Sequence, residues 1–239
     1  MLNQIKQDLN NLADKELSKN YSRFFKTGKG EYGEGDIFLG MRVPKLREVA
    51  KRYYEMNLTD LVKLLQTNIH EYRLGALIIL VNKYKKAKKN NNDLEQRKIV
   101  NLYLDNTKYI NNWDLVDSSA HYILGEYLLE KENLKDRKIL YDLAKSKDLW
   151  ERRISVISTF AFIRNNQFED SLKISKILLY DHHDLIHKAV GWMLREIGKR
   201  NQEVEEKFLK QHYKTMPRTM LRYAIEKFEE NKRQWYLKK

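Results

Sequence analysis

Tryptophan and arginine side chains recur along this chain at intervals close to 40 residues. Trp113, Arg153 and Trp192 are separated by 40 and 39 residues, and Asp117 follows the first tryptophan by one helical turn. A period of about 40 residues is typical of stacked helix pairs, in which each repeat contacts only its neighbours. Because residues one period apart occupy equivalent positions, we expect these four side chains to converge on one face.

Residues that interrupt helices are scarce, with only two prolines and nine glycines among 239 residues. Pro44 and Pro217 both stand where a helix can begin, since the first turn tolerates a missing N–H. Apolar residues recur with helical spacing along nearly the whole chain, and no strand-like alternation is found. Long apolar helices are expected near 70–85, 113–130, 149–163, 185–199 and 217–228. Shorter amphipathic helices are expected near 58–66, 94–106, 136–146, 168–180 and 201–213.

This alternation predicts an all-α fold, a HEAT-like helical repeat solenoid (an α-α superhelix) with a basic concave face. Residues 1–239 are expected to form a single domain of stacked helix pairs. The second helix of each pair lines the concave surface in such arrays.

The segment 27–36, TGKGEYGEGD, holds four of the nine glycines and is predicted to be a Gly-rich loop insertion. It matches the spacing G-x-G-x-x-G of dinucleotide-binding turns, but a helical segment precedes it where that motif requires a strand. Glu31, Glu34 and Asp36 would also repel a pyrophosphate. A flexible or capping loop is therefore favoured over a nucleotide site.

Positive charge dominates the composition. Lys and Arg number 46 against 33 Asp and Glu, the net charge is +13, and the isoelectric point is near 9.5. Such an excess favours a nucleic acid or another anionic surface as partner. The segment 83–93 alone carries five lysines and three asparagines; it is predicted to be a frayed helix end running into a Lys/Asn-rich loop, with a DNA contact as the alternative.

Several classes of protein are excluded or disfavoured by what the sequence lacks. There is no cysteine, which excludes disulfides, thiolate chemistry and cysteine-based zinc sites. The N-terminal residues have no apolar core of a signal peptide, and the longest apolar run, LGALIILV, is too short to span a membrane. A cytoplasmic protein without a membrane contact is expected.

The run HHDLIH places His183 and His187 four residues apart, on one face of a helix. Two imidazoles at this spacing can bind a metal ion. No third ligand is evident, however, and no glutamate stands where the H-E-x-x-H motif requires one. An ordinary helix start capped by Asp181 or Asp184 is favoured, and no metal is expected.

Trp113 and Asp117 share a helix face because they are four residues apart. A purely structural interpretation is available for each candidate taken alone. Asn112 can cap the helix, Trp113 and Trp192 can pack in the core, and Arg153 can form ion pairs along the repeats. Their joint periodicity is what favours a functional interpretation.

Three motifs resemble one known family. NNWDLVDSS, LWERRIS and HKAVGWMLREIGK are similar to the DNA alkylation repair family, the HEAT-like-repeat alkylpurine DNA glycosylases of the AlkD type. FLGMRVPKLREVAK is similar to the N-terminal segment of that family, and the resemblance covers roughly residues 15–230. It implies a curved array of helix pairs that holds DNA in a basic groove and excises N3- and N7-alkylated purines. It also implies that the lesion stays stacked rather than being flipped out.

The resemblance assigns roles to individual residues. The family's catalytic aspartate corresponds to Asp117, and its two active-site tryptophans correspond to Trp113 and Trp192. The family's backbone-contacting arginine corresponds to Arg153, and the arginine after the second tryptophan, Arg195, is an expected phosphate contact. Two further basic side chains, Arg152 and Lys188, are also expected to bind DNA. Some members carry a tyrosine where this chain has Phe24, so a hydroxyl near the lesion is missing here. That departure and the Gly-rich insertion leave the range of lesions open.

The chemistry suits these residue types. An alkylated purine is cationic and leaves without protonation, so the barrier moves to the sugar, which becomes oxocarbenium-like as the glycosidic bond opens. A carboxylate beside the sugar, here Asp117, can stabilise that charge and orient a water. The indole faces of Trp113 and Trp192 can each stabilise a cation by about 0.5–2 kcal/mol.

The sequence thus predicts a monofunctional alkylpurine DNA glycosylase, a hydrolase that needs no cofactor. It is expected to act as a monomer on double-stranded DNA containing alkylated purines and to leave an abasic site. Two alternatives stay open. One is a non-catalytic HEAT-like module that binds damaged or branched DNA. The other is a protein-binding scaffold, since many HEAT arrays bind proteins.

Overall fold

The computed structural model describes residues 1–131 and 134–238, and the regular secondary structure in these ranges is helical. Within them, the one β-type contact is an isolated parallel bridge between Ile37 and Ile69. None of the helices in the described ranges is both long and apolar enough to cross a membrane. The predicted all-α class is confirmed.

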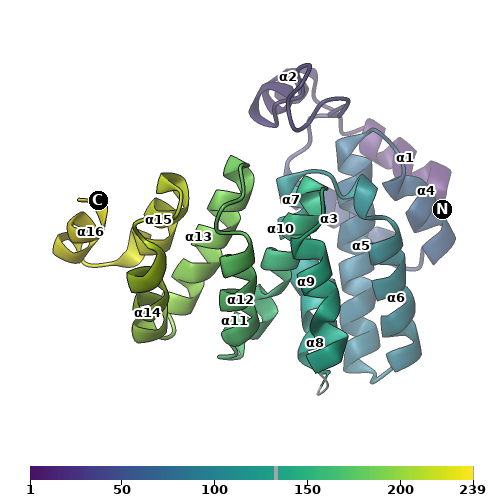
Figure 1. Cartoon of the computed structure of the whole chain (residues 1–239). Coiled ribbons are helices and arrows are strands. Elements are labelled where there is room, and N and C mark those ends of the chain that lie inside the picture. Colours follow the sequence, from purple (N-terminus) through teal and green to yellow (C-terminus); the bar gives the residue numbers. More distant parts are fainter. Residues whose placement is uncertain (132–133, 239) are drawn as a thin grey trace. The chain divides into compact units, whose positions relative to one another are not determined.

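The chain divides into two compact units, Met1–Ile123 and Leu124–Lys239. Figure 1 shows the order of their helices along the chain. The single domain over 1–239 and the basic concave face both stay predictions.

The first unit is arranged around one long buried helix. Its helical elements are α1 (Leu2–Asn10), α2 (Lys15–Phe24), α3 (Val43–Arg52), α4 (Leu58–Leu65), α5 (His70–Lys89), α6 (Asp93–Asp105), η1 (Thr107–Tyr109) and α7 (Trp113–Asp117). α3, α4 and α6 all pack against α5, which is buried around most of its circumference. A helix that is apolar on all sides, as in LGALIILV, is expected at such a central position.

α5 is longer than the sequence indicates. Of the segment 83–93, which was predicted to be a frayed helix end running into a Lys/Asn-rich loop, the part up to Lys89 forms the final turns of α5, so the helical part is longer than expected. Two features stabilise the additional turns. Tyr84 and Ala87 are buried, and the lysines of the last turn interact favourably with the negative end of the helix dipole. The loop proper is confined to the asparagines, where Asn91 adopts a φ of 50°.

A buried carboxylate on α5 holds the FLGM segment. Glu71 accepts hydrogen bonds from the backbone N–H groups of Leu39 and Gly40, at 2.8 Å each, and of Met41 at 3.2 Å. Gly40 has a φ of +83°, and a Cβ there would lie 2.1 Å from the Asp14 carbonyl oxygen. Only glycine fits this position, which explains why the segment reads F-L-G.

The second unit contains the remaining helices. They are α8 (Glu126–Leu129), η3 (Leu134–Arg137), α9 (Lys138–Ala144), α10 (Leu149–Ser158), α11 (Phe160–Arg164), α12 (Glu169–Ile177), α13 (Asp184–Gly198), α14 (Gln202–His212), α15 (Arg218–Ala224), η4 (Ile225–Lys227) and α16 (Glu230–Leu237). α13 packs against α10, α12, α14 and α15. The predicted alternation of short and long helices holds for α4 and α5, with 8 and 20 residues, and for α12 and α13, with 9 and 15. It fails for α14 and α15, where the first helix has 11 residues and the second has 7.

Some of the long predicted helices are interrupted. The stretch expected at 113–130 is divided into α7, a π-helical segment His121–Gly125 and α8, and the stretch at 149–163 is divided into α10 and α11. Hydroxyl groups lie at both breaks. Ser119 donates to the carbonyl of Leu115 at 2.6 Å, and Thr159 donates to that of Val156 at 2.7 Å. Such bonds compete with the helical ladder and bend or end a helix.

Two glycines inside helices give a matched test of this packing. A Cβ at Gly191 in α13 would lie 2.5 Å from the Met220 carbonyl oxygen and from the Tyr223 Cβ, whereas a Cβ at Gly75 in α5 would have nothing closer than 3.6 Å. We expect Gly191→Ala to lower the free energy of unfolding by about 1–3 kcal/mol through overpacking. Gly75→Ala should raise it by up to about 1 kcal/mol because alanine is the better helix former. Urea denaturation measures both, and equal effects would contradict the packing described.

Candidate functional site

α7 carries the two candidate residues of the first unit. The Asn112 side chain caps this helix and accepts from the backbone N–H of Trp113 at 2.8 Å, as predicted. Trp113 and Asp117 lie one turn apart and are both half-buried. The Asp117 carboxylate lies near the buried Tyr103 phenol: burial raises the pKa of Tyr103, and the charge of Asp117 raises it further.

A stack of aromatic rings supports Trp113. Its indole stacks on Phe25, with ring centroids 5.2 Å apart and planes at 17°, and Phe25 in turn stacks on Phe38 at 4.9 Å. Phe38 stacks on the imidazole of His70 at 4.4 Å. Phe24 contacts the edge of Trp113 at 5.9 Å and is 64% exposed. The plane of the indole is therefore fixed from one side by α2 and the segment that follows it.

A buried polar network begins at His70, the last ring of this stack. His70 lies between two carboxylates: its Nδ1 is 3.3 Å from Asp36 Oδ2 and its Nε2 is 2.8 Å from Asp114 Oδ2. The Arg73 guanidinium is 2.6 Å from Asp36 Oδ2, and Asn112 Nδ2 donates to the same oxygen at 3.2 Å. We call these five residues the His70 network. It joins the Gly-rich loop, the start of α5 and the start of α7.

The charges in the His70 network stabilise one another. Burial alone would lower the pKa of His70, but the charge of Asp114 and hydrogen bonds to Asp114 and Asp36 raise it to about 8. Burial alone would raise the pKa of Asp36, but the hydrogen bond with His70 and the Arg73 guanidinium hold it below its ordinary value. At neutral pH the network therefore contains an imidazolium with a carboxylate at each ring nitrogen.

Sequence reasoning missed this network, although a signal was present. His70 and Arg73 open the most apolar helix of the chain, where charged side chains three residues apart share a buried face. Buried charged groups are rare unless they are paired, so partners elsewhere in the chain had to exist. Their identity could not be read from the sequence, because Asp36 and Asp114 stand 34 and 44 residues away.

In the Gly-rich loop 27–36, side chains of the loop accept hydrogen bonds from its own backbone N–H groups. Glu31 accepts from the N–H of Gly28 and Glu34 from the N–H of Gly30, each at 2.8 Å. These are the amides that a dinucleotide-binding turn would offer to a pyrophosphate. Asp36 at the end of the loop forms part of the His70 network.

The two neighbouring arginines of α10 contact other parts of the second unit. Arg153 is 4% exposed and donates through Nη1 to the carbonyl of Leu185 at 2.5 Å. Arg152 lies 2.6 Å from Asp181 Oδ2 through its Nε, and its Nη1 donates to the carbonyls of Ser146 and Lys147. Arg153 thus ties α10 to the first turn of α13.

Trp192 lies on α13 and is half-buried. Its Nε1 donates to Glu196 Oε1 at 3.1 Å, and its ring centroid is 5.8 Å from that of Phe160 on α11. The indole therefore packs against the core on one part and is exposed on another.

The other two basic candidates on α13 have carboxylate partners. Arg195 pairs with Glu226, and Lys188 Nζ lies 2.6 Å from Asp184 Oδ2. Their predicted contacts with DNA stay predictions, as do those of Arg152 and Arg153. The convergence of Trp113 and Asp117 with Arg153 and Trp192 on one face also stays a prediction.

His183 and His187, at the start of α13, form hydrogen bonds with backbone groups. His183 Nδ1 accepts from the N–H of Leu185 at 3.1 Å and caps the helix, so the expected cap, Asp181 or Asp184, was wrong. Asp181 instead accepts from the N–H of His183 at 2.8 Å, and His187 Nε2 lies 2.5 Å from the Asp181 carbonyl. No group of three or more metal-binding side chains is found in the described part of the chain.

A comparison with protein families decides the relationship. The model of the family described as DNA alkylation repair enzyme matches residues 5–228, nearly the whole chain. This chain belongs to the DNA alkylation repair enzyme family. Membership confirms the resemblance drawn from the three motifs and indicates a role in the repair of alkylated DNA. A search of curated proteins finds no match.

Solved structures share the fold of this family member. One from Enterococcus faecalis, described as a predicted DNA alkylation repair enzyme, is 16% identical, with a TM-score of 0.70 over 91% of this chain and 97% of that chain. The structure of AlkD2 from Streptococcus mutans is 17% identical, with a TM-score of 0.57 over 89% of this chain and 98% of that one. These likenesses confirm the helical-repeat fold.

The His70 network predicts how stability depends on pH. Because the pKa of His70 is higher in the folded chain than its ordinary 6.5, its contribution is complete below pH 6.5 and is lost as the pH rises through 8. A shift of this size corresponds to about 2 kcal/mol. Urea denaturation between pH 6 and 9 should show this decline in the wild type and a flatter profile in His70→Gln. Parallel profiles for the two proteins would contradict the charged network.

Proposed function

We propose that this protein is a monofunctional DNA glycosylase that hydrolyses the N-glycosidic bond of cationic N3- or N7-alkylated purines in duplex DNA. One observation carries the proposal: Trp113 and Asp117 lie on a single turn of α7, and that turn is held by an aromatic stack and a buried ionic network. Catalytic groups must be held close to their productive geometry by the residues around them. The described residues around α7 supply such support.

In the proposed reaction, the cationic base leaves as a neutral purine and the sugar becomes oxocarbenium-like. The Asp117 carboxylate stabilises the positive charge at C1′ and orients a water molecule, which adds to C1′ and loses a proton. The products are the free base and an abasic site. The reaction consumes only water, so we propose that it needs no cofactor.

The two tryptophans have complementary roles in the proposal. Trp113 offers an electron-rich face to the cationic sugar or base, and the stack beneath it keeps that face in place. Trp192 is proposed as the second active-site tryptophan; its half-buried position on α13 leaves part of the indole accessible. Phe24 lies at the edge of Trp113 and presents an apolar surface where some family members have a hydroxyl.

Binding of DNA is proposed to use Arg152, Arg153, Lys188 and Arg195. Each of these already has a protein partner, so a phosphate must share or displace it. For Lys188 the exchange costs little, since exposed ion pairs contribute at most about 1 kcal/mol. We propose that the protein acts as a monomer in the cytoplasm on double-stranded DNA.

Replacing the carboxylate of Asp117 tests the reaction directly. We expect Asp117→Asn to slow the single-turnover release of 7-methylguanine from methylated duplex DNA by at least about 100-fold, because the transition-state charge loses its stabilising partner. Affinity for DNA should hold or rise, since a negative charge near the phosphates is removed. Chromatography of the released base and fluorescence anisotropy measure the two effects.

Asp105→Asn is the matched control, because Asp105 is exposed at the end of α6 and the change in charge is the same. It should release the base at the wild-type rate. A folded wild type that binds DNA and releases no base would favour the non-catalytic binding module. A wild type that does not bind DNA at low salt would favour the protein scaffold.

A further inference from the structure

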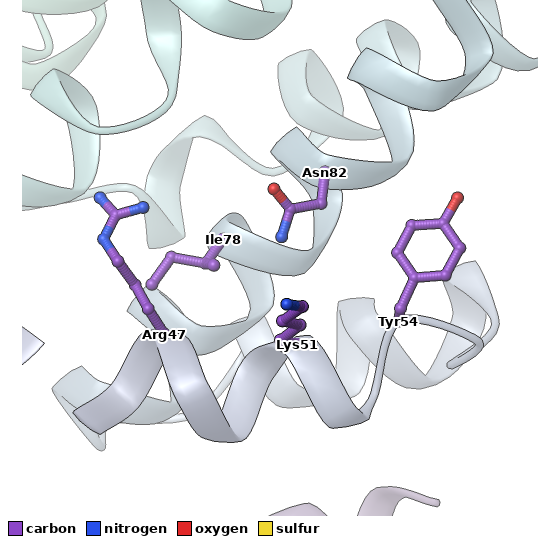
Figure 2. Close-up of a pocket in the computed structure, with 5 residues that line it drawn as sticks. All are labelled: Arg47, Lys51, Tyr54, Ile78 and Asn82. Carbon is purple, nitrogen blue, oxygen red and sulfur yellow. The ribbon is translucent and has the colours of Figure 1, made fainter. Parts of the chain in front are cut away.

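A basic groove lies between α3 and α5 in the first unit. It is a cavity of 520 Å³ lined by Arg47, Lys51, Tyr54, Ile78 and Asn82. Figure 2 shows the first three rising from α3 and the turn after it, toward the last two on α5. Ile78 is buried and forms an apolar floor, while the polar side chains at the rim are exposed or half-buried.

The polar side chains form a line rather than a ring. Arg47 and Lys51 are one turn apart on α3, about 6 Å along its axis, and Tyr54 follows in the turn after the helix. Two more cations stand at the Tyr54 end, where the Nζ atoms of Lys83 and Lys86 each lie 4.8 Å from the centre of the Tyr54 ring. The groove is therefore longer than a single phosphate and is positively charged along its length.

The cations of the groove differ from those around them in having no carboxylate partner. Lys45 and Arg52, on the same helix, pair with Glu48 and Asp8. Within the described residues, neither Arg47 nor Lys51 has an acidic group within ion-pair distance. At the far end of the groove, the charges of Glu55 and Glu95 both act on Lys83.

We propose that this groove binds consecutive backbone phosphates of a DNA strand. The Arg47 guanidinium can grip a phosphate with two hydrogen bonds, and Lys51 supplies a point charge one helical turn away. The Asn82 amide and the Tyr54 hydroxyl can donate to phosphate oxygens without reading the sequence. The inference rests on the proposed function insofar as DNA is the ligand.

The groove is separate from the reacting site. Ile78 and Asn82 follow His70 on α5 by eight and twelve residues, which corresponds to roughly 12–18 Å along the helix axis. Duplex DNA advances 3.4 Å per base pair, so a strand that runs along α5 would be held several nucleotides from the lesion. The groove thus anchors the backbone and leaves the chemistry to α7.

The test compares two double variants that remove the same charge. Arg47→Ala/Lys51→Ala removes the unpaired cations, and Lys45→Ala/Lys63→Ala removes two exposed lysines that are already paired. Binding of undamaged duplex DNA is measured by anisotropy across a salt series. Each phosphate contact contributes about −0.9 to the slope of log K against log salt.

We expect the groove variant to lose roughly 1–2 units of that slope and to bind at least about 10-fold more weakly at low salt. The control should stay within about 2-fold of the wild type. Both variants should show the thermal stability of the wild type, since the four side chains are exposed. Equal slopes and affinities for the two variants would overturn the inference.

Two further arms separate the alternatives. Binding of inorganic phosphate by the wild type at constant ionic strength, lost in the groove variant while the affinity for DNA is unchanged, would assign the groove to a free phosphate and overturn the strand assignment. Base release by the wild type is measured independently. If the wild type releases the base but the groove variant binds DNA as the wild type does, only the groove proposal is overturned. If the salt slopes are as expected but no base is released, only the glycosylase proposal is overturned.

Discussion

The bridge that His70 makes between Asp36 and Asp114 is the interaction on which the first unit's candidate site depends. It connects three segments that are far apart in sequence, and Arg73 and Asn112 complete it on the Asp36 side. Removing one partner of a buried ionic network leaves an uncompensated charge, so the network holds together as a whole. α7 is only five residues long and has little stability of its own, so its orientation comes from these contacts.

The aromatic stack and the ionic network hold different parts of α7 in place. The stack from His70 through Phe38 and Phe25 fixes the face of Trp113, while the bond to Asp114 fixes the first turn from which Trp113 and Asp117 project. A glycosylase that works on an already cationic base needs little acid catalysis and depends on placing a carboxylate beside the sugar. Rigid support of a short helix meets that requirement.

Much of the fold could be predicted, because helical periodicity is a local signal. The Asn112 cap and the helix start at Pro44 followed from residue chemistry alone. The end of α5 was missed because a run of lysines looks like a solvated loop until the burial of Tyr84 is known. Of the candidate site, Trp113 and Asp117 were proposed from the sequence, and their roles stay predictions. Asp36 and Asp114 could not be linked to His70 from the sequence, since only the tertiary fold brings them together.

The His70 network is proposed to hold α7 in the position that the reaction requires. Single-turnover release of 7-methylguanine by wild type and His70→Gln, measured from pH 6.5 to 8.5, tests it most directly. We expect the wild-type rate to fall as the pH rises through about 8, where His70 loses its proton, and the variant to be slower with a flatter profile. A His70→Gln protein that matches the rate and pH profile of the wild type would contradict the claim.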